Sequence, residues 1–191
     1  MEYQFLLTMM DPTTGVLLIA DPFLKDDNFM RTVLLICRHS EDGSFGFVIN
    51  KQYDLTLADL FTDMESFRIP VFIGGPVQMD TIHYIHQYPD FFPDSQQVTD
   101  DIYWGGDFEK LKEFIKEGKI DYSKIKFFIG YSGWEPGQLE NEMEEKSWLT
   151  ASSTQEIVFS TPVEEIWKAS LKHLGGKYEM MINFPIDPQL N

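Results

Sequence analysis

Hydrophobic positions gather in short runs rich in β-branched and aromatic residues, and turn-forming residues separate these runs. This pattern is typical of β-strands. It predicts strands at Val16–Ala20, Thr32–Arg38, Phe45–Asn50, Val71–Ile73, Thr81–Gln87, Gln97–Trp104, Ile125–Gly130 and Glu156–Phe159. Between the second and third runs lies Glu41-Asp42-Gly43-Ser44. Because Asp-Gly tolerates the positive φ angles of a tight turn, this segment predicts an antiparallel hairpin.

Helix signals are clearest near the end of the chain. Thr161, Pro162 and Glu164 have the spacing of an N-cap, a first helical proline and a capping box, and Gly175 marks the end of the helix. The apolar face of this helix places Trp167 in the core. Further helices are predicted over 107–117, from about residue 136 with Leu139 and Met143 facing the core, and over the short stretch 56–61.

Strands outnumber helices and do not alternate strictly with them. The pattern therefore favours an α+β fold with a mixed, largely antiparallel sheet over a doubly wound α/β fold. The 10 Pro and 13 Gly are scattered, and no repeat, linker or low-complexity tract divides the chain. We expect one domain over residues 1–191.

Composition narrows the range of partners. The chain has 15 Lys and Arg against 31 Asp and Glu, a formal net charge of −16. Nucleic acids and anionic membranes attract proteins through Lys and Arg, so direct binding to either is not expected. Lysines do gather between residues 110 and 126, but acids interleave with them. Glu109 with Lys112 and Glu113 with Lys116 are expected to pair on a solvated helix surface.

Cysteine usage and the start of the chain bear on location. Cys37 is the single cysteine and lies in an apolar run, which favours a buried structural thiol and fits a reducing compartment. The first residues, Met1-Glu2-Tyr3, lack the basic region of a signal peptide, and no apolar stretch approaches the roughly 20 residues that span a bilayer. We therefore expect a cytoplasmic protein.

Common catalytic and metal-binding motifs, among them the phosphate loop, H-E-x-x-H and paired C-x-x-C, are absent from the sequence. His83 and His86 lie three residues apart on a predicted strand, so they face opposite sides and are not expected to share a metal; His86 is expected to be a hydrogen-bonded strand-end residue. Ser132 lies in a near match to a nucleophile elbow, but Trp134 replaces its second glycine, which favours a tight turn covered by Trp134. We expect no catalytic residue, metal or cofactor.

Two segments carry the remaining candidate chemistry. Gly74 and Gly75 end a short strand, and residues without side chains expose backbone N–H groups to an anion. Trp134, Gln138 and Glu140 follow a later strand and would converge with the glycines on a small molecule. The alternative is that both segments are turns with structural roles. Separately, Arg31 is expected to pair with a carboxylate of the connector 21–31.

Several of these segments together resemble the YqgE/AlgH family of bacterial proteins. The resemblance rests on Gly15-Val16-Leu17-Leu18-Ile19-Ala20-Asp21-Pro22, Phe29-Met30-Arg31-Thr32-Val33, Gly43-Ser44-Phe45-Gly46-Phe47-Val48-Ile49-Asn50-Lys51, Gly74-Gly75-Pro76-Val77, His86 with Pro89, Gly130-Tyr131-Ser132-Gly133-Trp134, Gly137-Gln138-Leu139-Glu140, Trp148-Leu149, and Thr161-Pro162 with Trp167. Their order and spacing agree over nearly the whole chain.

The resemblance implies an α+β domain whose sheet curls into a pseudo-barrel with flanking helices. One branch of the family is named for a regulatory role in alginate production and carries the label of a transcriptional regulator, and the family provides no catalytic residues to transfer. A charge of −16 and the lack of a basic recognition helix argue against direct DNA binding. The leading hypothesis is a cytosolic, non-enzymatic regulatory or interaction protein with a protein partner; the alternative is a small-molecule-binding protein or enzyme.

Overall fold

The computed structural model describes residues 10–184, so the amino-terminal segment used above to argue against a signal peptide lies outside the described residues. A single sheet runs through the molecule in the order β10-β1-β2-β3-β9-β6-β8-β7, and β5 pairs with both β4 and β9. Its strands are β1 (Val16–Ala20), β2 (Val33–Ser40), β3 (Gly43–Val48), β4 (Gln52–Thr56), β5 (Pro70–Ile73), β6 (Val77–His86), β7 (Gln96–Gln97), β8 (Tyr103–Trp104), β9 (Ile125–Trp134) and β10 (Trp148–Ser152).

The predicted α+β class is confirmed. The pairing of β5 with β9 is parallel and the other strand pairs of residues 10–184 are antiparallel. Within these residues no pairing joins β10 to β7, so the sheet is open and the word pseudo-barrel describes it only loosely. The hairpin predicted at Asp42-Gly43 is confirmed, because β2 and β3 pair antiparallel up to Ser40 and Gly43.

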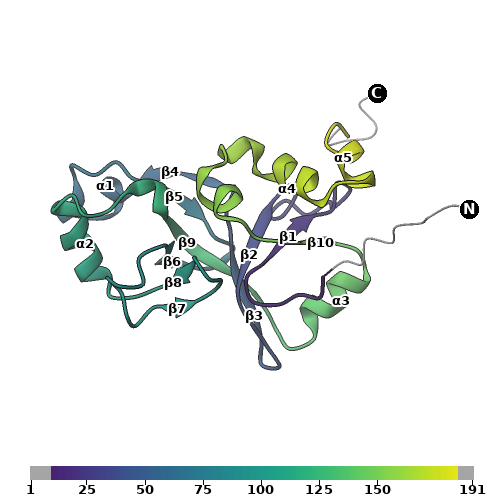
Figure 1. Cartoon of the computed structure of the whole chain (residues 1–191), viewed down its shortest axis with the longest axis horizontal. Coiled ribbons are helices and arrows are strands. Elements are labelled where there is room, and N and C mark those ends of the chain that lie inside the picture. The colour runs from purple at the N-terminus through teal and green to yellow at the C-terminus, as the bar shows by residue number, and fades with distance from the viewer. Residues whose placement is uncertain (1–9, 185–191) are drawn as a thin grey trace, which may run out of the picture.

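One half of the sheet is covered on both faces (Figure 1). Alternate residues of β1 enter different clusters: Leu17 and Ile19 pack with α4 (Ile166–Leu174), and Leu18 and Ala20 pack with α3 (Gln138–Glu144). A strand covered on both sides has no polar face, which explains the unbroken apolar run in the sequence. Trp167 of α4 is buried and its indole N–H donates to the Ala20 carbonyl at 3.0 Å, so its predicted core role is confirmed.

The other half of the sheet forms a second lobe (Figure 1) with α1 (Leu57–Leu60), η1 (Thr62–Met64) and α2 (Phe108–Lys116). Its core contains Leu57, Met64, Leu111 and Ile115. The predicted ion pair between Glu109 and Lys112 is present at 2.9 Å. The predicted pair of Glu113 with Lys116 is not among the ion pairs of residues 10–184, because the Lys116 ammonium reaches Asp63 at 2.8 Å instead.

Strand β9 joins the two halves. Residues 125–129 pair with β6 and β5, and residues 132–134 pair with β3. Between them Gly130 has φ 65°, and a Cβ there would approach the Gly75 carbonyl oxygen to 2.6 Å, so only glycine fits. The sequence predicts a strand that ends at Gly130 and a turn around Ser132. This prediction was wrong, because the strand continues to Trp134 through that glycine.

A second irregularity lies in β2, where the register with β3 shifts between Ile36 and Arg38. Leu35 and Cys37 belong to the α4-facing cluster and Ile36 to the α3-facing cluster. Arg38 pairs with Phe45, which also belongs to the α4-facing cluster. Residues 37 and 38 therefore lie toward the same face, as an extra residue in one strand produces. The bulge directs Arg38 to one face of the β2–β3 ribbon and His39 to the other.

The segment before α4 differs from its prediction. Residues 156–159, predicted as a strand, lie in η3 (Glu156–Ser160), a π-helical turn whose Ile157 and Val158 are buried. The predicted N-cap was also wrong, because the Thr161 hydroxyl donates to the Glu156 carbonyl at 2.9 Å instead of accepting a helical N–H. A 3₁₀ turn, η4 (Val163–Glu165), precedes α4, and Gly175 ends that helix at φ 69° as predicted. The remaining elements are η2 (Tyr122–Lys124) and α5 (Lys177–Met181).

The predicted strand over 97–104 was also wrong in its middle, since only β7 and β8 at its two ends pair. Cys37 is buried, and burial raises the pKa of its thiol above the usual range, in agreement with the predicted structural role. Of the helices in residues 10–184, none has the length and apolar character needed to cross a bilayer.

Candidate functional site: a cleft at the end of the β2–β3 ribbon

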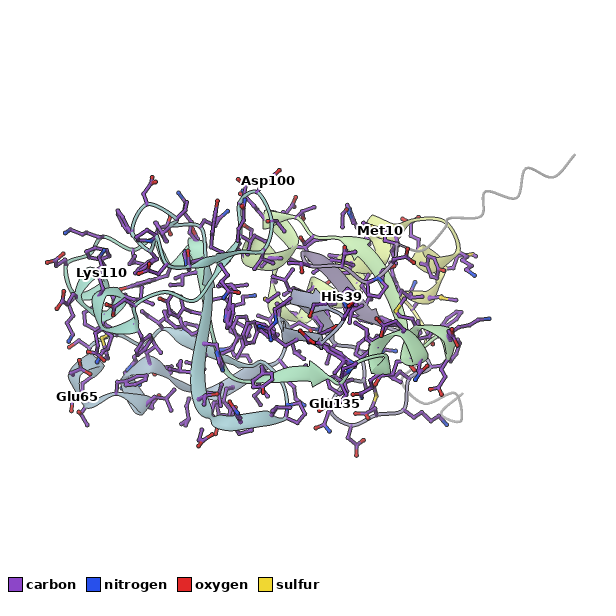
Figure 2. All side chains as sticks on the ribbon, turned by 90° about the horizontal axis from the view of Figure 1, so that it is seen from below. Met10, His39, Glu65, Asp100, Lys110 and Glu135 are labelled. Carbon is purple, nitrogen blue, oxygen red and sulfur yellow. The ribbon has the colours of Figure 1, made fainter. Side chains whose placement is uncertain are left out.

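Strands β2 and β3 form a two-stranded ribbon, and a cleft lies beside its hairpin end, which is called the far end below. The volume of the cleft is about 500 Å³, which suits a small organic ligand. Figure 2 views the molecule from below Figure 1 and labels His39 on this ribbon and Glu135 after β9. Strands β2, β3, β6, β8 and β9 and the start of α3 supply the walls. The lining residues are Arg38, Asp42, Gly43, Ser44, Phe45, Val77, His83, Trp104, Tyr131, Gly133, Trp134, Glu135 and Gln138.

Aromatic rings form one wall of this cleft. The Phe45 ring lies 4.6 Å from Trp104 and 6.1 Å from Tyr131 between centroids, both in edge-to-face arrangements. Trp104 and Tyr131 are only partly buried, so they present apolar surface to the cleft. Packed aromatic rings of this kind stack well on planar ligands.

Arg38 is the cationic side chain among the lining residues. Its guanidinium lies 5.2 Å from the centroid of the Phe45 ring. Among residues 10–184, no carboxylate lies within 4.0 Å of it. The planar fork of an arginine binds carboxylate and phosphate groups through paired hydrogen bonds, so this guanidinium can hold an anion at the aromatic wall.

His83 of β6 is half-buried, and burial lowers the pKa of its imidazole, which favours the neutral form. The Thr81 hydroxyl donates to the Gln78 carbonyl at 2.8 Å, and its oxygen lies 2.9 Å from Nε2 of His83. Since that hydroxyl has one proton, Nε2 carries the imidazole proton and donates it to Thr81. Nδ1 is then left as a hydrogen-bond acceptor on a residue that lines the cleft.

A polar array lies on the opposite face of the ribbon and includes the cleft residue Ser44. The Ser44 hydroxyl oxygen is 2.7 Å from Nδ1 of His39, and Nε2 of His39 is 3.7 Å from a carboxylate oxygen of Glu140. The three residues come from β3, β2 and α3, respectively. Cross-strand pairing of His39 with Ser44 sets the first contact, and the packing of α3 on the sheet sets the second.

The predicted ligand-binding residues are divided between two hollows. Trp134 and Gln138 line the cleft, whereas Glu140 is not among its lining residues and lies 3.7 Å from His39 on the opposite face of the ribbon. Gly75 lines a separate hollow of about 280 Å³ together with Lys51. Gly74 is buried, donates its N–H to the Ile129 carbonyl at 2.9 Å, and is enclosed by β9. The structure therefore does not bring the glycine turn and the segment 134–140 to one site.

Trp134 does not cover a tight turn, contrary to the prediction from the sequence. Its side chain is buried against α3, and its indole N–H donates to a carboxylate oxygen of Glu142 at 2.9 Å. The Trp148 indole donates to the same oxygen at 2.8 Å, and Gln138 donates to the other oxygen at 3.0 Å. Glu142 thus fixes both indoles and the cleft residue Gln138, although the sequence analysis did not single it out.

Two of the other singled-out residues have structural roles. The Ser132 hydroxyl is buried and donates to the Gly74 carbonyl at 3.1 Å, so it joins β9 to the glycine turn. His86 accepts the Tyr88 N–H at Nδ1 and donates from Nε2 to the Gly105 carbonyl at 2.9 Å, which confirms the predicted strand-end role. It packs against Tyr84, whereas His83 packs against Phe47, so the two histidines face opposite sides as predicted.

The contacts of Arg31 differ from the predicted ion pair. Its guanidinium lies 4.8 Å from the centroid of the Trp167 ring and donates to the Phe184 carbonyl. No carboxylate of residues 10–184 lies within ion-pair distance of it, so the predicted pairing within the connector was wrong. Within the same residues, no cluster of three or more His, Cys, Asp or Glu has the arrangement of a metal site.

Comparison with known proteins assigns the fold to a family. The sequence profile of the AlgH-like family matches residues 17–179. The chain belongs to this family. Relatives named UPF0301 protein are 42% identical over 180 residues in Cytophaga hutchinsonii (94% of this chain, 99% of the relative) and 42% identical over 177 residues in Chlorobium limicola (93% and 95%). Their names state no activity.

Solved structures agree with the AlgH-like assignment. The solution structure of AlgH from Pseudomonas aeruginosa has a TM-score of 0.73 and 28% identity, with 94% of this chain and 98% of that chain covered. A crystal structure of a Corynebacterium diphtheriae protein has a TM-score of 0.78 and 21% identity, with 92% and 94% covered, and shows the fold alone. The expected family membership is confirmed.

Sequence reasoning missed Arg38, His39, Ser44 and His83 as site residues. One signal was available: Arg38, His39 and Ser44 are polar residues within or beside β-rich runs that flank the predicted hairpin. Polar residues at the ends of otherwise apolar strands mark the point where a sheet leaves the core. The bulge that orients Arg38 has no comparable signal, because the apolar run before it is continuous.

Proposed function

We propose that this AlgH-like protein binds a small planar molecule with one anionic group in the cleft beside the β2–β3 ribbon. The observation that carries the proposal is the guanidinium of Arg38, which lies on the Phe45 ring with no carboxylate of the described residues within 4.0 Å. An arginine held on an aromatic wall without a neighbouring carboxylate is suited to bind an external anion.

The other lining residues further restrict the shape and polarity of the ligand. Trp104 and Tyr131 offer stacking surface, so the ligand is flat. Asp42 and Glu135 also line the cleft, and their negative charges favour a ligand whose remaining groups donate hydrogen bonds. His83 supplies a neutral acceptor at Nδ1 for one of those donors. A nucleobase or similar heterocycle with a phosphate or carboxylate satisfies each of these requirements.

The test is a thermal-shift panel of nucleoside monophosphates, their uncharged nucleosides, and aromatic carboxylates. A ligand at 100 times its dissociation constant stabilises the folded state by about 2.7 kcal/mol, which corresponds to a shift of roughly 5 to 10 °C for a chain of this size. We expect a nucleoside monophosphate or aromatic carboxylate to give such a shift and its uncharged counterpart a smaller one.

Arg38→Ala is expected to remove the difference between the charged and uncharged ligands. Arg68→Ala is the matched control, because Arg68 is an exposed arginine outside the cleft and its loss changes the net charge equally. A flat panel at millimolar concentrations, or shifts that persist unchanged in Arg38→Ala, would contradict the proposal.

We further propose that the protein is a cytoplasmic regulatory protein that contacts a protein partner, without direct DNA binding. Exposed apolar side chains favour a protein contact: Phe23 is 54% exposed and Met180 is 70% exposed. The net charge of −16 supports the absence of DNA binding. Affinity capture from native lysate should give a stoichiometric partner that Phe23→Ser weakens; only background binding in repeated captures would contradict this role.

A further inference from the structure

A second hollow lies at the glycine turn that follows β5, apart from the cleft. Its lining residues are Asn28, Val48, Lys51, Ile73, Gly75, Pro76 and Met79. None of them lines the cleft, and none belongs to β9. The volume is about 280 Å³, and a water molecule occupies about 30 Å³ of the liquid. The hollow therefore has room for a ligand of about six to nine non-hydrogen atoms.

Backbone hydrogen bonds hold the walls of this hollow in place. The Ile73 N–H donates to the Lys51 carbonyl at 2.8 Å, which fixes the residue before β4 beside the end of β5. The Val48 N–H donates to the Gly74 carbonyl at 2.9 Å, which joins the end of β3 to the glycine turn. The positions of Lys51 and Gly75 relative to each other therefore follow from strand pairing.

The backbone N–H of Gly75 has no hydrogen-bond acceptor among residues 10–184, although the residue is buried. The peptide bond before Gly75 is trans, so this N–H points opposite to the Gly74 carbonyl. That carbonyl accepts from the Ser132 hydroxyl of β9 at 3.1 Å. The N–H is therefore directed away from β9, toward the side on which the hollow lies. Since nearly all buried N–H groups are paired, an acceptor bound in the hollow would satisfy it.

Two side chains add hydrogen-bond donors to the same hollow. Lys51 is partly buried, and no carboxylate of the described residues lies within 4.0 Å of its ammonium. Within residues 10–184, Asn28 donates its backbone N–H to Asp26 and leaves its side-chain amide without a partner. No Asp or Glu is among the lining residues. A cation and two neutral donors without a lining acid favour an anionic group.

The other walls are apolar and restrict the rest of the ligand. Val48, Ile73, Pro76 and Met79 present aliphatic or thioether surface, and no aromatic ring lines this hollow. Met79 is 43% exposed, and its flexible side chain can adapt to the shape of a bound chain. A ligand with a short aliphatic chain would cover this surface, whereas inorganic phosphate would leave it in water.

We propose that this hollow binds a short aliphatic carboxylate, whose oxygens accept from the Gly75 N–H and the Lys51 ammonium. The site shares no lining residue with the cleft and does not rest on the proposed function. It retains the anion that the sequence analysis expected at the glycine turn. The partner of the turn is Lys51, in place of Trp134 and Gln138.

The experiment is titration of the ¹⁵N-labelled natural chain with hexanoate, followed by two-dimensional NMR and calorimetry. We expect saturable binding with a Kd of about 1 mM or tighter, and the largest chemical-shift change at the Gly75 amide. Hexanamide should bind at least about 10-fold more weakly, because it has no charge to pair with Lys51. Acetate and inorganic phosphate should also bind at least about 10-fold more weakly, because they leave the apolar walls uncovered.

Two substitutions test the location of the carboxylate. Lys51→Gln should weaken hexanoate binding by about 10- to 100-fold, the factor expected when a hydrogen bond to a charged group is lost. Lys172→Gln is the matched control, because Lys172 is exposed on α4, lies outside the hollow and changes the net charge equally. Met79→Glu should also prevent binding by adding a negative charge to the wall, whereas the neutral Met79→Gln should retain most of it.

The outcomes separate this site from the cleft. Absence of saturable hexanoate binding, equal affinity for hexanamide, or an equal loss in Lys172→Gln would overturn the site, and equal affinity for phosphate would overturn the aliphatic ligand. Loss of binding in Arg38→Ala but not in Lys51→Gln would place hexanoate in the cleft and refute the second site. A nucleoside monophosphate that binds without hexanoate binding would leave the proposed function intact.

The reverse result, hexanoate binding at Gly75 with no response to the cleft ligands, would support this site and contradict the proposed function. Urea unfolding of each variant shows whether it is folded. Should Lys51→Gln fail to fold, the comparison of hexanoate with hexanamide and the Gly75 shift in the natural chain still decide the question.

Discussion

The two ends of the β2–β3 ribbon differ in what surrounds them. At the core end, Leu35 pairs with Phe47, and both are fully buried in the cluster that also contains residues of α4. At the far end, Arg38 pairs with Phe45 and His39 pairs with Ser44, beside a cleft. The same two strands thus supply fully buried packing at one end and the candidate site at the other. A rigid, buried end holds the polar end in a defined position, as functional sites require.

The largest difference between the two ends is expected in their packing energies. Phe47 is fully buried and stacks on Phe128 with centroids 4.6 Å apart. Phe47→Ala should lower the free energy of unfolding by about 3 to 5 kcal/mol, because it leaves a cavity in a closed core. The measurement is equilibrium unfolding in urea.

Phe45→Ala provides the comparison. Phe45 borders the cleft, so its truncation enlarges an existing hollow that water can enter, and the loss should be smaller than for Phe47→Ala. Equal losses for the two variants would show that the far end is as tightly packed as the core end and would break the comparison.

A smaller loss of folding stability is expected from a substitution in α3, the helix that packs beside the far end of the ribbon. Glu142→Ala removes the acceptor shared by the buried Trp134 and Trp148 indoles, and should lower stability by about 2 kcal/mol. The tryptophan fluorescence emission of the folded Glu142→Ala variant should also differ from that of the natural chain, because both indoles lose this partner. Glu144→Ala is the matched control, because this exposed acid on the same helix should change stability by less than about 0.5 kcal/mol. Equal effects of the two variants would rule out the indole contacts as the cause.

The last effect is a gradual change of stability with pH and comes from a buried charge near the core end. Burial lowers the pKa of Lys126 from 10.5 to about 8, and its ammonium donates to the Ile49 carbonyl at 3.1 Å. Between pH 8 and pH 10.5, the two pKa values of this group, Lys126 binds more protons in the unfolded chain than in the folded chain. Stability contributed by this group therefore increases with pH in this window, by roughly 1 kcal/mol per pH unit.

The test compares urea unfolding of the natural chain and Lys126→Met from pH 7.5 to 10. The difference in stability between them should change with the expected slope above pH 8. Cys37 and Tyr84 have raised pKa values and oppose the rise above pH 9, but they do so in both proteins and cancel in the difference. A difference that stays constant with pH would show that Lys126 remains charged when folded.

Local signals in the sequence determined much of this protein. Continuous apolar runs identified β1 and the start of β2, because strands covered on both faces need no polar positions. Asp42-Gly43 identified the hairpin, and Gly175 identified the end of α4. The acidic composition and the family resemblance also needed only the sequence. The short run at 156–159 misled, because β-branched residues in a π-helical turn have the same composition as a strand.

Tertiary structure alone decided which residues share the site. Side chains along a strand alternate between the two faces of the sheet. The bulge after Ile36 and the left-handed Gly130 each interrupt this alternation, so the residues that follow lie on the opposite face from the one that regular alternation predicts. Arg38 and Tyr131 reach the cleft for this reason. The contact of His39 with Glu140 joins a strand to a helix about 100 residues later in the chain, a separation over which local sequence signals contain no information about pairing.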